Sequence, residues 1–391
     1  MSENQYIAKT LAGLEPVLAD ELRELGASGV SLFRRAVGFS GDLAMLYNAN
    51  IWLRTAVSVL KPLRSFSFQS KDDFYEKMRE EAWHEHFSPD KTIAVIATAH
   101  DSEVFNNTMF LAQLTKDAIV DRFQDACGSR PDVDTAGANV RIVVNVHQDQ
   151  CKVSLDSSGD ALFKRGYRKT GGRAPLNEVL AAGLIKLAGW DKKSPFLDPM
   201  CGSGTFSIEA GMMSARMAPG AGRREFGFSH WKDFSPELFQ NLRENAKAKE
   251  EPLKVPIIAS DIKGMMLDIT RQNAMNAGLL GSIQVRKQDF FSYHVREENG
   301  LVMLNPPYGH RMTARDTRAL YIHIGDILKK QFAGFTAGVI SADLGAMKHL
   351  GLKPKRKFEV FNGPLKAAYN VYELFRGTHK DYRKHSSHSS E

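Results

Sequence analysis

Short apolar runs and amphipathic helical patterns alternate along the whole chain. In the first part, the spacing of the apolar positions changes often between a strand period and a helix period. Strand patterns cover residues 6–11, 30–39, 56–68, 92–99, 140–147 and 151–155, and helical patterns cover 14–25, 43–53, 73–87 and 109–126. This mixture predicts two small α+β units, over residues 1–67 and 68–156.

A more regular order begins at Leu176, where strand, turn and helix patterns repeat. This repetition predicts a doubly wound α/β domain with a parallel sheet, over residues 175–378. Its strands are expected at 195–198, 256–260, 283–287, 301–304, 337–341, 357–361 and 369–375. The turn Asn362-Gly363-Pro364 separates the last two strands and predicts an antiparallel hairpin at the sheet edge. Residues 379–391 are polar without an apolar period, and we expect a disordered tail there.

The composition is typical of a soluble globular protein, because 43% of the residues are hydrophobic and 25% are charged. The sequence contains no run of about 18 consecutive apolar residues, which a membrane helix would need. Its N-terminus lacks the pattern of a signal peptide. The three cysteines are too few for a disulfide framework or a cysteine-based zinc site. These patterns predict a cytoplasmic protein without a bound metal.

The charge is distributed unevenly along the chain. Residues 1–155 carry 16 basic and 21 acidic side chains, whereas residues 156–391 carry 36 and 24. A segment at residues 157–174 lies between the α+β units and the α/β domain. Its residues 164–173 hold five cations and one aromatic side chain, and no acid. The cations are Lys164, Arg165, Arg168, Lys169 and Arg173. The segment is a candidate RNA contact; the alternative is a solvated interdomain linker.

A glycine turn follows the first strand of the α/β domain, in the sequence Asp198-Pro199-Met200-Cys201-Gly202-Ser203-Gly204-Thr205. Open α/β sheets bind ligands at such strand ends, where glycines let the backbone approach the ligand and a threonine can cap the next helix. The segment lacks the lysine of a Walker loop and the third glycine of a dinucleotide fingerprint, where Ser207 stands. These features predict a nucleoside-type cofactor without phosphates.

Two later strand ends offer acceptors for such a cofactor. Asp261 follows an apolar run, where its carboxylate could accept both ribose hydroxyls. Asp289 follows the next strand, and the ring of Phe290 beside it could stack on adenine. The alternatives are structural: Asp261 as the N-cap of a helix at 264–277, Asp289 as a cap, and Phe290 as a core residue.

The segment Asn305-Pro306-Pro307-Tyr308 follows another apolar strand. An exocyclic base amine is a poor nucleophile because its lone pair is delocalised into the ring. The side-chain oxygen of Asn305 and the carbonyl of Pro306 could hold both amine hydrogens and aim the lone pair at an electrophilic methyl group. Tyr308 could stack on a base taken out of its helix. The alternative is a rigid turn without chemistry.

These motifs, in this order, resemble the Rossmann-like S-adenosylmethionine-dependent methyltransferases that modify exocyclic amines. Further segments resemble the THUMP-domain 23S rRNA guanine-N2 methyltransferases: Gly166-Tyr167-Arg168 with Ala174-Pro175-Leu176-Asn177-Glu178, and Asn362-Gly363-Pro364-Leu365. In the first half, Gly41-Asp42-Leu43 and Trp52-Leu53-Arg54-Thr55-Ala56 are similar to the ferredoxin-like segment of that family. The resemblance implies a ferredoxin-like domain at 1–67 and a THUMP domain at 68–156.

The resemblance also implies the function and its residues. It implies methyl transfer from S-adenosylmethionine to guanine N2 of 23S ribosomal RNA or its precursor, with Asn305, Pro306, Pro307 and Tyr308 around the base. The implied cofactor contacts are Asp198, Pro199, Cys201, Gly202, Gly204, Thr205, Asp261, Asp289 and Phe290. Two alternatives stay open: an adenine-N6 methyltransferase acting on DNA or RNA, and a non-catalytic RNA-binding ribosome assembly factor.

Overall fold

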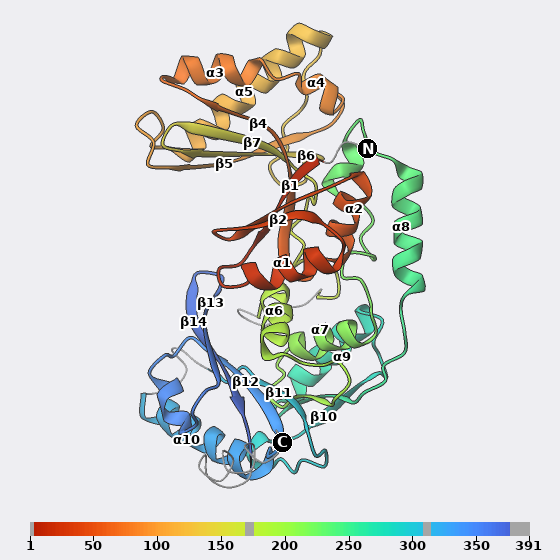
Figure 1. The fold of residues 1–391 in the computed structure, drawn as a ribbon, viewed down its shortest axis with the longest axis vertical. Helices are drawn as coiled ribbons and strands as arrows, with labels where there is room; N and C mark the ends of the chain where they lie inside the picture. Colours follow the sequence, from red (N-terminus) through yellow and green to blue (C-terminus); the bar gives the residue numbers. More distant parts are fainter. Residues whose placement is uncertain (1–3, 169–175, 308–313, 376–391) are drawn as a thin grey trace, which may run out of the picture. The chain divides into compact units, whose positions relative to one another are not determined.

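The computed structural model describes residues 4–168, 176–307 and 314–375 (Figure 1). The chain divides into two compact units that do not follow the sequence order. Unit 1 consists of Met1–Thr10, Leu18–Leu162 and Gly220–Asn245, and unit 2 consists of Leu11–Val17, Phe163–Pro219 and Ala246–Glu391.

Unit 1 contains a seven-stranded sheet with the strand order β2-β3-β1-β4-β7-β6-β5. The strands are β1 (Asn4–Thr10), β2 (Ser28–Phe33), β3 (Ala36–Gly41), β4 (Ala56–Ser67), β5 (Ile93–His100), β6 (Val140–His147) and β7 (Gln150–Asp156). The helices that begin in the first 155 residues are α1 (Glu15–Glu24), α2 (Leu43–Trp52), α3 (Lys71–Arg79), α4 (Trp83–His86) and α5 (Thr108–Cys127). The long strand β4 pairs with β1 on one side and β7 on the other, so the two α+β patterns share one sheet.

Two elements of unit 1 differ from the sequence prediction. The single strand expected at 30–39 is a hairpin of β2 and β3, because the chain reverses at Arg35 with a left-handed φ of 57°. The single helix expected at 73–87 is divided into α3 and α4. The side chain of Ser70 caps the start of α3 by accepting the amide of Asp73.

Residues 220–245 complete the core of unit 1 although they lie inside the α/β half of the sequence. They include the 3₁₀ helix η1 (Gly227–His230) and most of α8 (Pro236–Ala248). The ring of Phe228 stacks on Tyr47 of α2 with 4.2 Å between centroids, and Phe226 stacks on Phe228 at 5.1 Å. Gly227 passes so close to β7 that an added Cβ would lie 2.2 Å from the carbonyl oxygen of Asp156.

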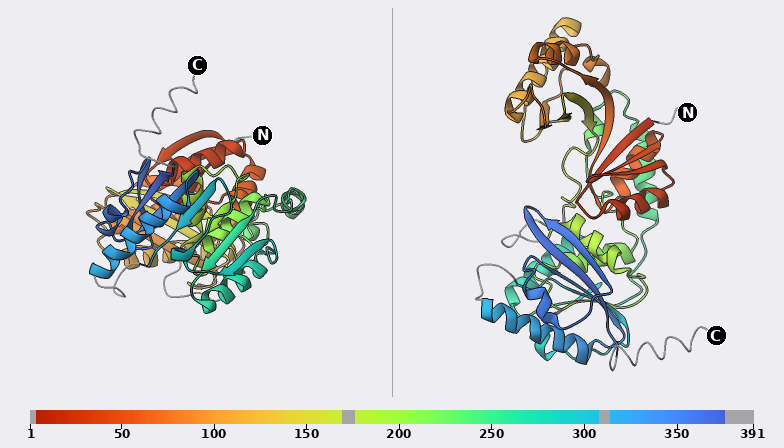
Figure 2. Two further views of the ribbon diagram at one scale, coloured as in Figure 1. Left: turned by 90° about the horizontal axis from the view of Figure 1, so that it is seen from below. Right: turned by 60° about the vertical axis from the view of Figure 1, so that its left-hand side comes forward.

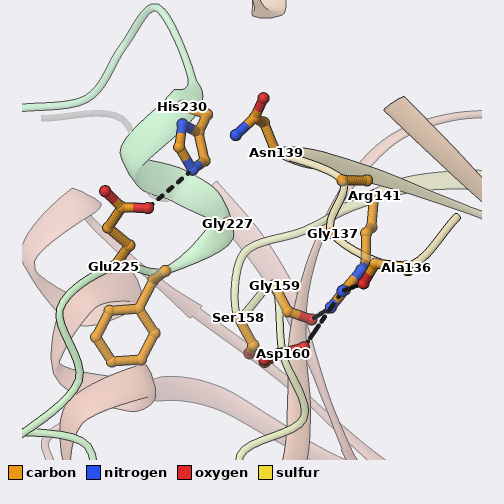
Figure 3. A pocket seen from close by; sticks show the side chains of 12 residues that line it. Ala136, Gly137, Asn139, Arg141, Ser158, Gly159, Asp160, Glu225, Gly227 and His230 are labelled. Carbon is orange, nitrogen blue, oxygen red and sulfur yellow. Dashed lines mark hydrogen bonds and ion pairs between the residues drawn. The ribbon is translucent and has the colours of Figure 1, made fainter. Parts of the chain in front are cut away.

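A polar pocket of about 200 Å³ lies where residues 225–230 meet the loops around β6 and β7 (Figure 3). Arg141 forms part of its wall, with its guanidinium bonded to Asp160 and to the carbonyl of Gly159. His230 faces Glu225 at 3.6 Å on the other wall. None of the candidate cofactor or base residues lines this pocket.

Replacing Phe228 with alanine is expected to destabilise the protein by about 3–5 kcal/mol, because it removes a fully buried ring from an aromatic core. Phe33→Ala is the matched control, since that ring is 56% exposed. Denaturant unfolding measures both variants. A loss for Phe228→Ala no larger than that of the control would show that residues 220–245 are not part of the core.

Unit 2 contains a second seven-stranded sheet, with the order β10-β9-β8-β11-β12-β14-β13. The strands are β8 (Phe196–Asp198), β9 (Ile257–Asp261), β10 (Ile283–Lys287), β11 (Gly300–Leu304), β12 (Phe335–Ser341), β13 (Arg356–Asn362) and β14 (Leu365–Glu373). The first five strands in this order are parallel, and β14 and β13 form an antiparallel hairpin at the edge. The predicted doubly wound fold with a terminal hairpin is confirmed.

Helices cover both faces of this sheet (Figure 2). One face carries α6 (Glu178–Ala188), α7 (Thr205–Ser214) and α9 (Gly264–Asn276), and the other carries α10 (Ala314–Gln331), with η2 (Phe290–Ser292) and η3 (Ala346–Leu350) beside it. Buried residues of α10, such as Tyr321 and Leu328, pack on Val302 and Val339 of the central strands. Across the described residues, no helix has the length and apolar character that a membrane span requires.

Candidate active site

Polar side chains lie at the ends of four neighbouring strands of unit 2. Asp198 ends β8, Asp261 ends β9, Asp289 comes two residues after β10, and Asn305 comes directly after β11. These strands are parallel neighbours in the order β10-β9-β8-β11, so their carboxyl ends lie at the same edge of the sheet. The structure therefore brings these four candidate residues to one edge, which is where open α/β sheets bind ligands.

The two glycines of the turn after β8 have different surroundings. Gly202 has a φ of 53° and its amide donates to Oδ2 of Asp261 at 3.0 Å. No heavy atom lies within 4 Å of where its Cβ would be, so the backbone is open on that side. At Gly204, with a φ of 80°, an added Cβ would lie 2.7 Å from Cγ2 of Thr270. The first glycine thus leaves room for a ligand, and the second permits close packing on α9.

Helix α9 holds this turn through its side chains. The hydroxyl of Thr270 donates to the carbonyl of Gly202 at 2.8 Å, and the amide of Asn273 donates to the carbonyl of Ser203 at 3.0 Å. Thr270 and Asn273 are three residues apart, so they lie on one face of the helix. Both are completely buried. The sequence analysis missed this pair, because a polar residue in a helix gives no sign of its distant partner.

Asp198 is a buried carboxylate with one free oxygen. It is 1% exposed, and the hydroxyl of Ser207 donates to its Oδ2 at 2.9 Å, while Oδ1 has no hydrogen-bond partner. Burial raises the pKa of Asp198 to about 7, and the nearby charge of Asp261 adds to this effect, while the bonds from Ser207 oppose it. An unpaired buried carboxylate oxygen is costly unless a donor or a cation meets it.

Asp261 does not cap the next helix through its side chain. The N-cap of α9 is Lys263, and Oδ1 of Asp261 accepts the Lys263 amide at 2.9 Å within the preceding turn. Its neighbour Ile262 is 59% exposed, which places an apolar surface directly beside the carboxylate. Ile262 is a candidate contact that the sequence analysis missed; the available signal was an apolar residue directly after a strand-ending acid.

The segment after β10 agrees with the structural alternatives. Asp289 is the N-cap of η2, and its Oδ1 accepts the amide of Phe291 at 3.0 Å. Phe290 is 2% exposed and stacks on Phe332 of the core, with 5.9 Å between ring centroids. The expected stacking face for adenine is therefore not open in the structure, because packing against α10 and its neighbours already uses this ring.

The turn after β11 presents an acceptor without a donor. Asn305 is partly buried, and its Oδ1 is inaccessible to solvent and has no hydrogen-bond partner. Pro306 is buried and Pro307 is exposed. Tyr308 lies outside the described residues. A buried amide oxygen without a partner is rare in folded proteins, and it fits a site where a ligand supplies the donor.

Two of the five candidate RNA-binding cations lie next to acidic side chains of unit 2 and are largely enclosed. The side chain of Arg165 is 2% exposed and lies 3.5 Å from the buried Glu209 of α7. The side chain of Arg168 is 15% exposed and lies 3.4 Å from Glu178 of α6. Acids distant in sequence pair with these two arginines, which favours a structural role over the predicted RNA contact. Lys164 is exposed, whereas Lys169 and Arg173 lie outside the described residues.

The expectation that Thr205 caps α7 is also corrected. The N-cap is Gly204, which has no side chain, and Thr205 is the first helical residue. Its hydroxyl accepts a hydrogen bond from Arg168 at 2.7 Å. Pro199 and Cys201 are buried beside the turn, and burial raises the pKa of the Cys201 thiol. In the described parts of the chain, no group of three or more metal-ligating side chains comes together.

Family models match three consecutive parts of the chain. The RlmL ferredoxin-like domain matches residues 5–60, the THUMP domain matches 68–156, and the RMKL-like methyltransferase domain matches 165–370. The chain belongs to the RMKL-like methyltransferase family. The ferredoxin-like and THUMP domains expected from the sequence resemblance are thereby confirmed.

Curated relatives of this RMKL-like methyltransferase include a protein of similar length and a longer one. A Synechocystis protein named "Putative RNA methyltransferase slr0064" is 38% identical over 95% of this chain and 97% of its own length. The Ribosomal RNA large subunit methyltransferase K/L of Syntrophotalea carbinolica is 36% identical over 95% of this chain and 53% of its own length. The chain thus spans about half the length of the K/L relatives.

Solved structures share the fold of the RMKL-like chain. SMU.472, crystallised in complex with SAH, has a TM-score of 0.86 at 27% identity, covering 97% of this chain and 100% of its own. A Listeria monocytogenes protein described as a predicted N6-adenine-specific DNA methylase has a TM-score of 0.85 at 29% identity, covering 96% and 97%.

Proposed function

We propose that this RMKL-like methyltransferase transfers a methyl group from S-adenosylmethionine to N2 of guanine in 23S ribosomal RNA. The observation that carries the proposal is the buried, unpartnered Oδ1 of Asn305, at the strand edge that also holds the open glycine turn. The names of the K/L relatives and the THUMP match support a ribosomal RNA substrate.

The cofactor would fit beside the ends of β8 and β9. S-adenosylmethionine supplies a methyl group on a sulfonium, and it also carries an ammonium group and two ribose hydroxyls. Oδ1 of Asp198 is a free acceptor for a cationic donor, and Asp261 has further acceptor capacity for the hydroxyls. The open space over Gly202 and the exposed side chain of Ile262 could receive the rest of the nucleoside.

The target base would meet the turn after β11. Oδ1 of Asn305 would accept one hydrogen of the exocyclic amine, and the carbonyl of Pro306 would accept the other. Both acceptors hold the amine in one orientation, so that its lone pair points along the line of the displacement. Positioning then supplies most of the rate, and no covalent bond to the protein forms.

Methyl transfer to 23S rRNA with labelled S-adenosylmethionine tests the function. After digestion of the RNA, mass spectrometry identifies the methylated nucleoside, and we expect N2-methylguanosine. Binding of RNA without transfer, by a protein that binds cofactor, would instead favour a non-catalytic assembly factor.

Adenine N6 is the second candidate acceptor. An amide oxygen and a backbone carbonyl can hold the amine of either base, so the Asn305 turn does not distinguish them. The name of the Listeria protein points to the same alternative. Detection of N6-methyladenosine in the same digest, with DNA and RNA offered separately, would replace the guanine proposal.

Replacing Asp261 with alanine is expected to weaken S-adenosylmethionine binding by about 1.5–3 kcal/mol, because it removes a charged acceptor and the partner of the Gly202 amide. Asp268→Ala is the control, since Asp268 is exposed on α9. Within the described residues, its side chain pairs only with Arg271. Calorimetry measures both affinities. Equal affinities in the two folded variants would contradict a cofactor role for Asp261.

A further inference from the structure

A short segment before α6, residues 163–168, carries positive charge into the interior of unit 2. We call it the arginine strap. Arg165, Tyr167 and Arg168 point into the unit, whereas Lys164 is exposed. Enclosing a charged side chain is costly unless an opposite charge pairs with it. The positions of Arg165 and Arg168 therefore call for a structural explanation.

Arg168 joins three parts of the unit through one guanidinium. Its Nη2 donates to the hydroxyl of Thr205 at 2.7 Å and to the carbonyl of Leu176 at 3.0 Å, and the same nitrogen lies 3.4 Å from Glu178. Thr205 is the first residue of α7, directly after the glycine turn. Arg168 therefore holds the side chain of the first helical residue after the glycine turn.

The rest of the strap anchors this arrangement. The hydroxyl of Tyr167 donates to Oε1 of Glu209 at 3.1 Å, one helical turn beyond Thr205. The side chain of Asn276 on α9 donates to the carbonyl of Tyr167 at 2.9 Å. Helix α9 also holds the carbonyls of Gly202 and Ser203. The glycine turn is thus held from α9 on one side and from the strap on the other.

We propose that Arg168 is a positioning residue for the cofactor, acting through Thr205 on the conformation of the glycine turn. The proposal rests on the proposed cofactor site but not on the identity of the methyl acceptor. It also replaces the RNA-binding role that the charge of Arg168 suggested. All three acceptors lie around Nη2, at the far end of the arginine side chain, and the shorter side chain of a lysine would not bring its ammonium to the same place.

A double-mutant cycle tests the coupling between the two side chains. The variants are Arg168→Lys, Thr205→Val and the double variant, and S-adenosylhomocysteine is the probe in calorimetry. Thr205→Val removes the hydroxyl that accepts from Arg168, together with its 3.5 Å contact to the Ser203 hydroxyl, and leaves the ion pair of Arg168 with Glu178 in place. We expect each single variant to weaken binding about tenfold, and the double variant to weaken it about tenfold instead of a hundredfold.

Two further readouts separate positioning from a general loss of structure. At saturating cofactor, kcat should stay close to wild type while KM for S-adenosylmethionine rises about tenfold. Affinity for 23S rRNA should change by less than about twofold, since Arg168 is not proposed to touch RNA. Arg271→Lys is the matched control: it makes the same chemical change at an exposed arginine of α9 and should leave cofactor affinity unchanged.

Three results would overturn the proposal. Additive losses in the cycle would mean that Arg168 and Thr205 act independently. Weaker RNA binding with unchanged cofactor affinity would return Arg168 to an RNA contact. Wild-type cofactor affinity in folded Thr205→Val would remove the proposed connection to the turn. A wild-type protein that binds S-adenosylhomocysteine but methylates no guanine would contradict the proposed function alone, because calorimetry would still test Arg168.

Discussion

Replacing Asn305 with alanine is expected to lower the single-turnover rate of methyl transfer by about 100-fold or more at saturating cofactor. The variant loses the acceptor that orients the amine, and an error of about 1 Å in such a geometry can alone cost about 100-fold. Cofactor affinity should stay near wild type, because the proposed cofactor contacts lie on β8 and β9. Most of the RNA affinity should also remain.

Two companion variants make this result specific. Asn299→Ala makes the same change at an exposed residue just before β11 and should leave the rate unchanged. Asn305→Asp keeps one acceptor oxygen but places a charge beside the base, so it should also be slow. Rapid-quench measurement of a single turnover gives all three rates. A folded Asn305→Ala variant with a near-normal rate would exclude this turn from catalysis.

Asp198→Asn is expected to weaken cofactor binding by about 2 kcal/mol, roughly 30-fold, while it stabilises the ligand-free protein at neutral pH. The pKa of Asp198 is about 7 in the folded protein and near 4 when unfolded. Between about pH 4 and pH 7, the carboxyl group of Asp198 is therefore protonated in the folded state and ionised in the unfolded state. The free energy of unfolding therefore falls as pH rises through this window, by up to about 1.4 kcal/mol per pH unit, and this loss is absent from the variant.

The measurement compares unfolding of wild type and variant between pH 5 and pH 8. The stability advantage of Asp198→Asn should grow up to about pH 7 and then level off. Asp156→Asn is the control, because burial raises the pKa of Asp156 to about 6 in unit 1, away from the strand edge. That variant should show a similar pH dependence with unchanged cofactor affinity. A pH-independent difference for Asp198→Asn would contradict the raised pKa of Asp198 in the folded protein.

The sequence predicted those parts of the fold and of the site that depend on residues close to one another in the sequence. Strand-ending side chains such as Asp261 and Asn305 follow clear apolar runs, and parallel pairing then places them at one edge. The chain reversal at Arg35 was missed because an arginine with positive φ gives no turn signal of the kind glycine gives. Arg168 and Thr205 are 37 positions apart in the sequence, so no local pattern predicts the hydrogen bond between them.

Side-chain roles that depend on burial could not be predicted. Phe290 follows a strand-ending acid, which suited an adenine contact, but the sequence does not reveal that Phe332 covers its ring. The cations of the strap suggested a surface, although Glu178 and Glu209 pair with two of them in the interior. In both cases the deciding neighbour comes from another helix or loop, and only the packed structure shows it.

The placement of residues 220–245 has a consequence for synthesis on the ribosome. Unit 1 cannot close its aromatic core around Tyr47 until Phe228 and Phe239 have left the exit tunnel, more than 60 residues after its last strand ends at Asp156. By then β8 and α7 of unit 2 have already been made. Unit 1 can therefore complete its core only after part of unit 2 has been synthesised, so the synthesis of the two units overlaps. Any evolutionary exchange of the N-terminal half would have to carry this later segment with it.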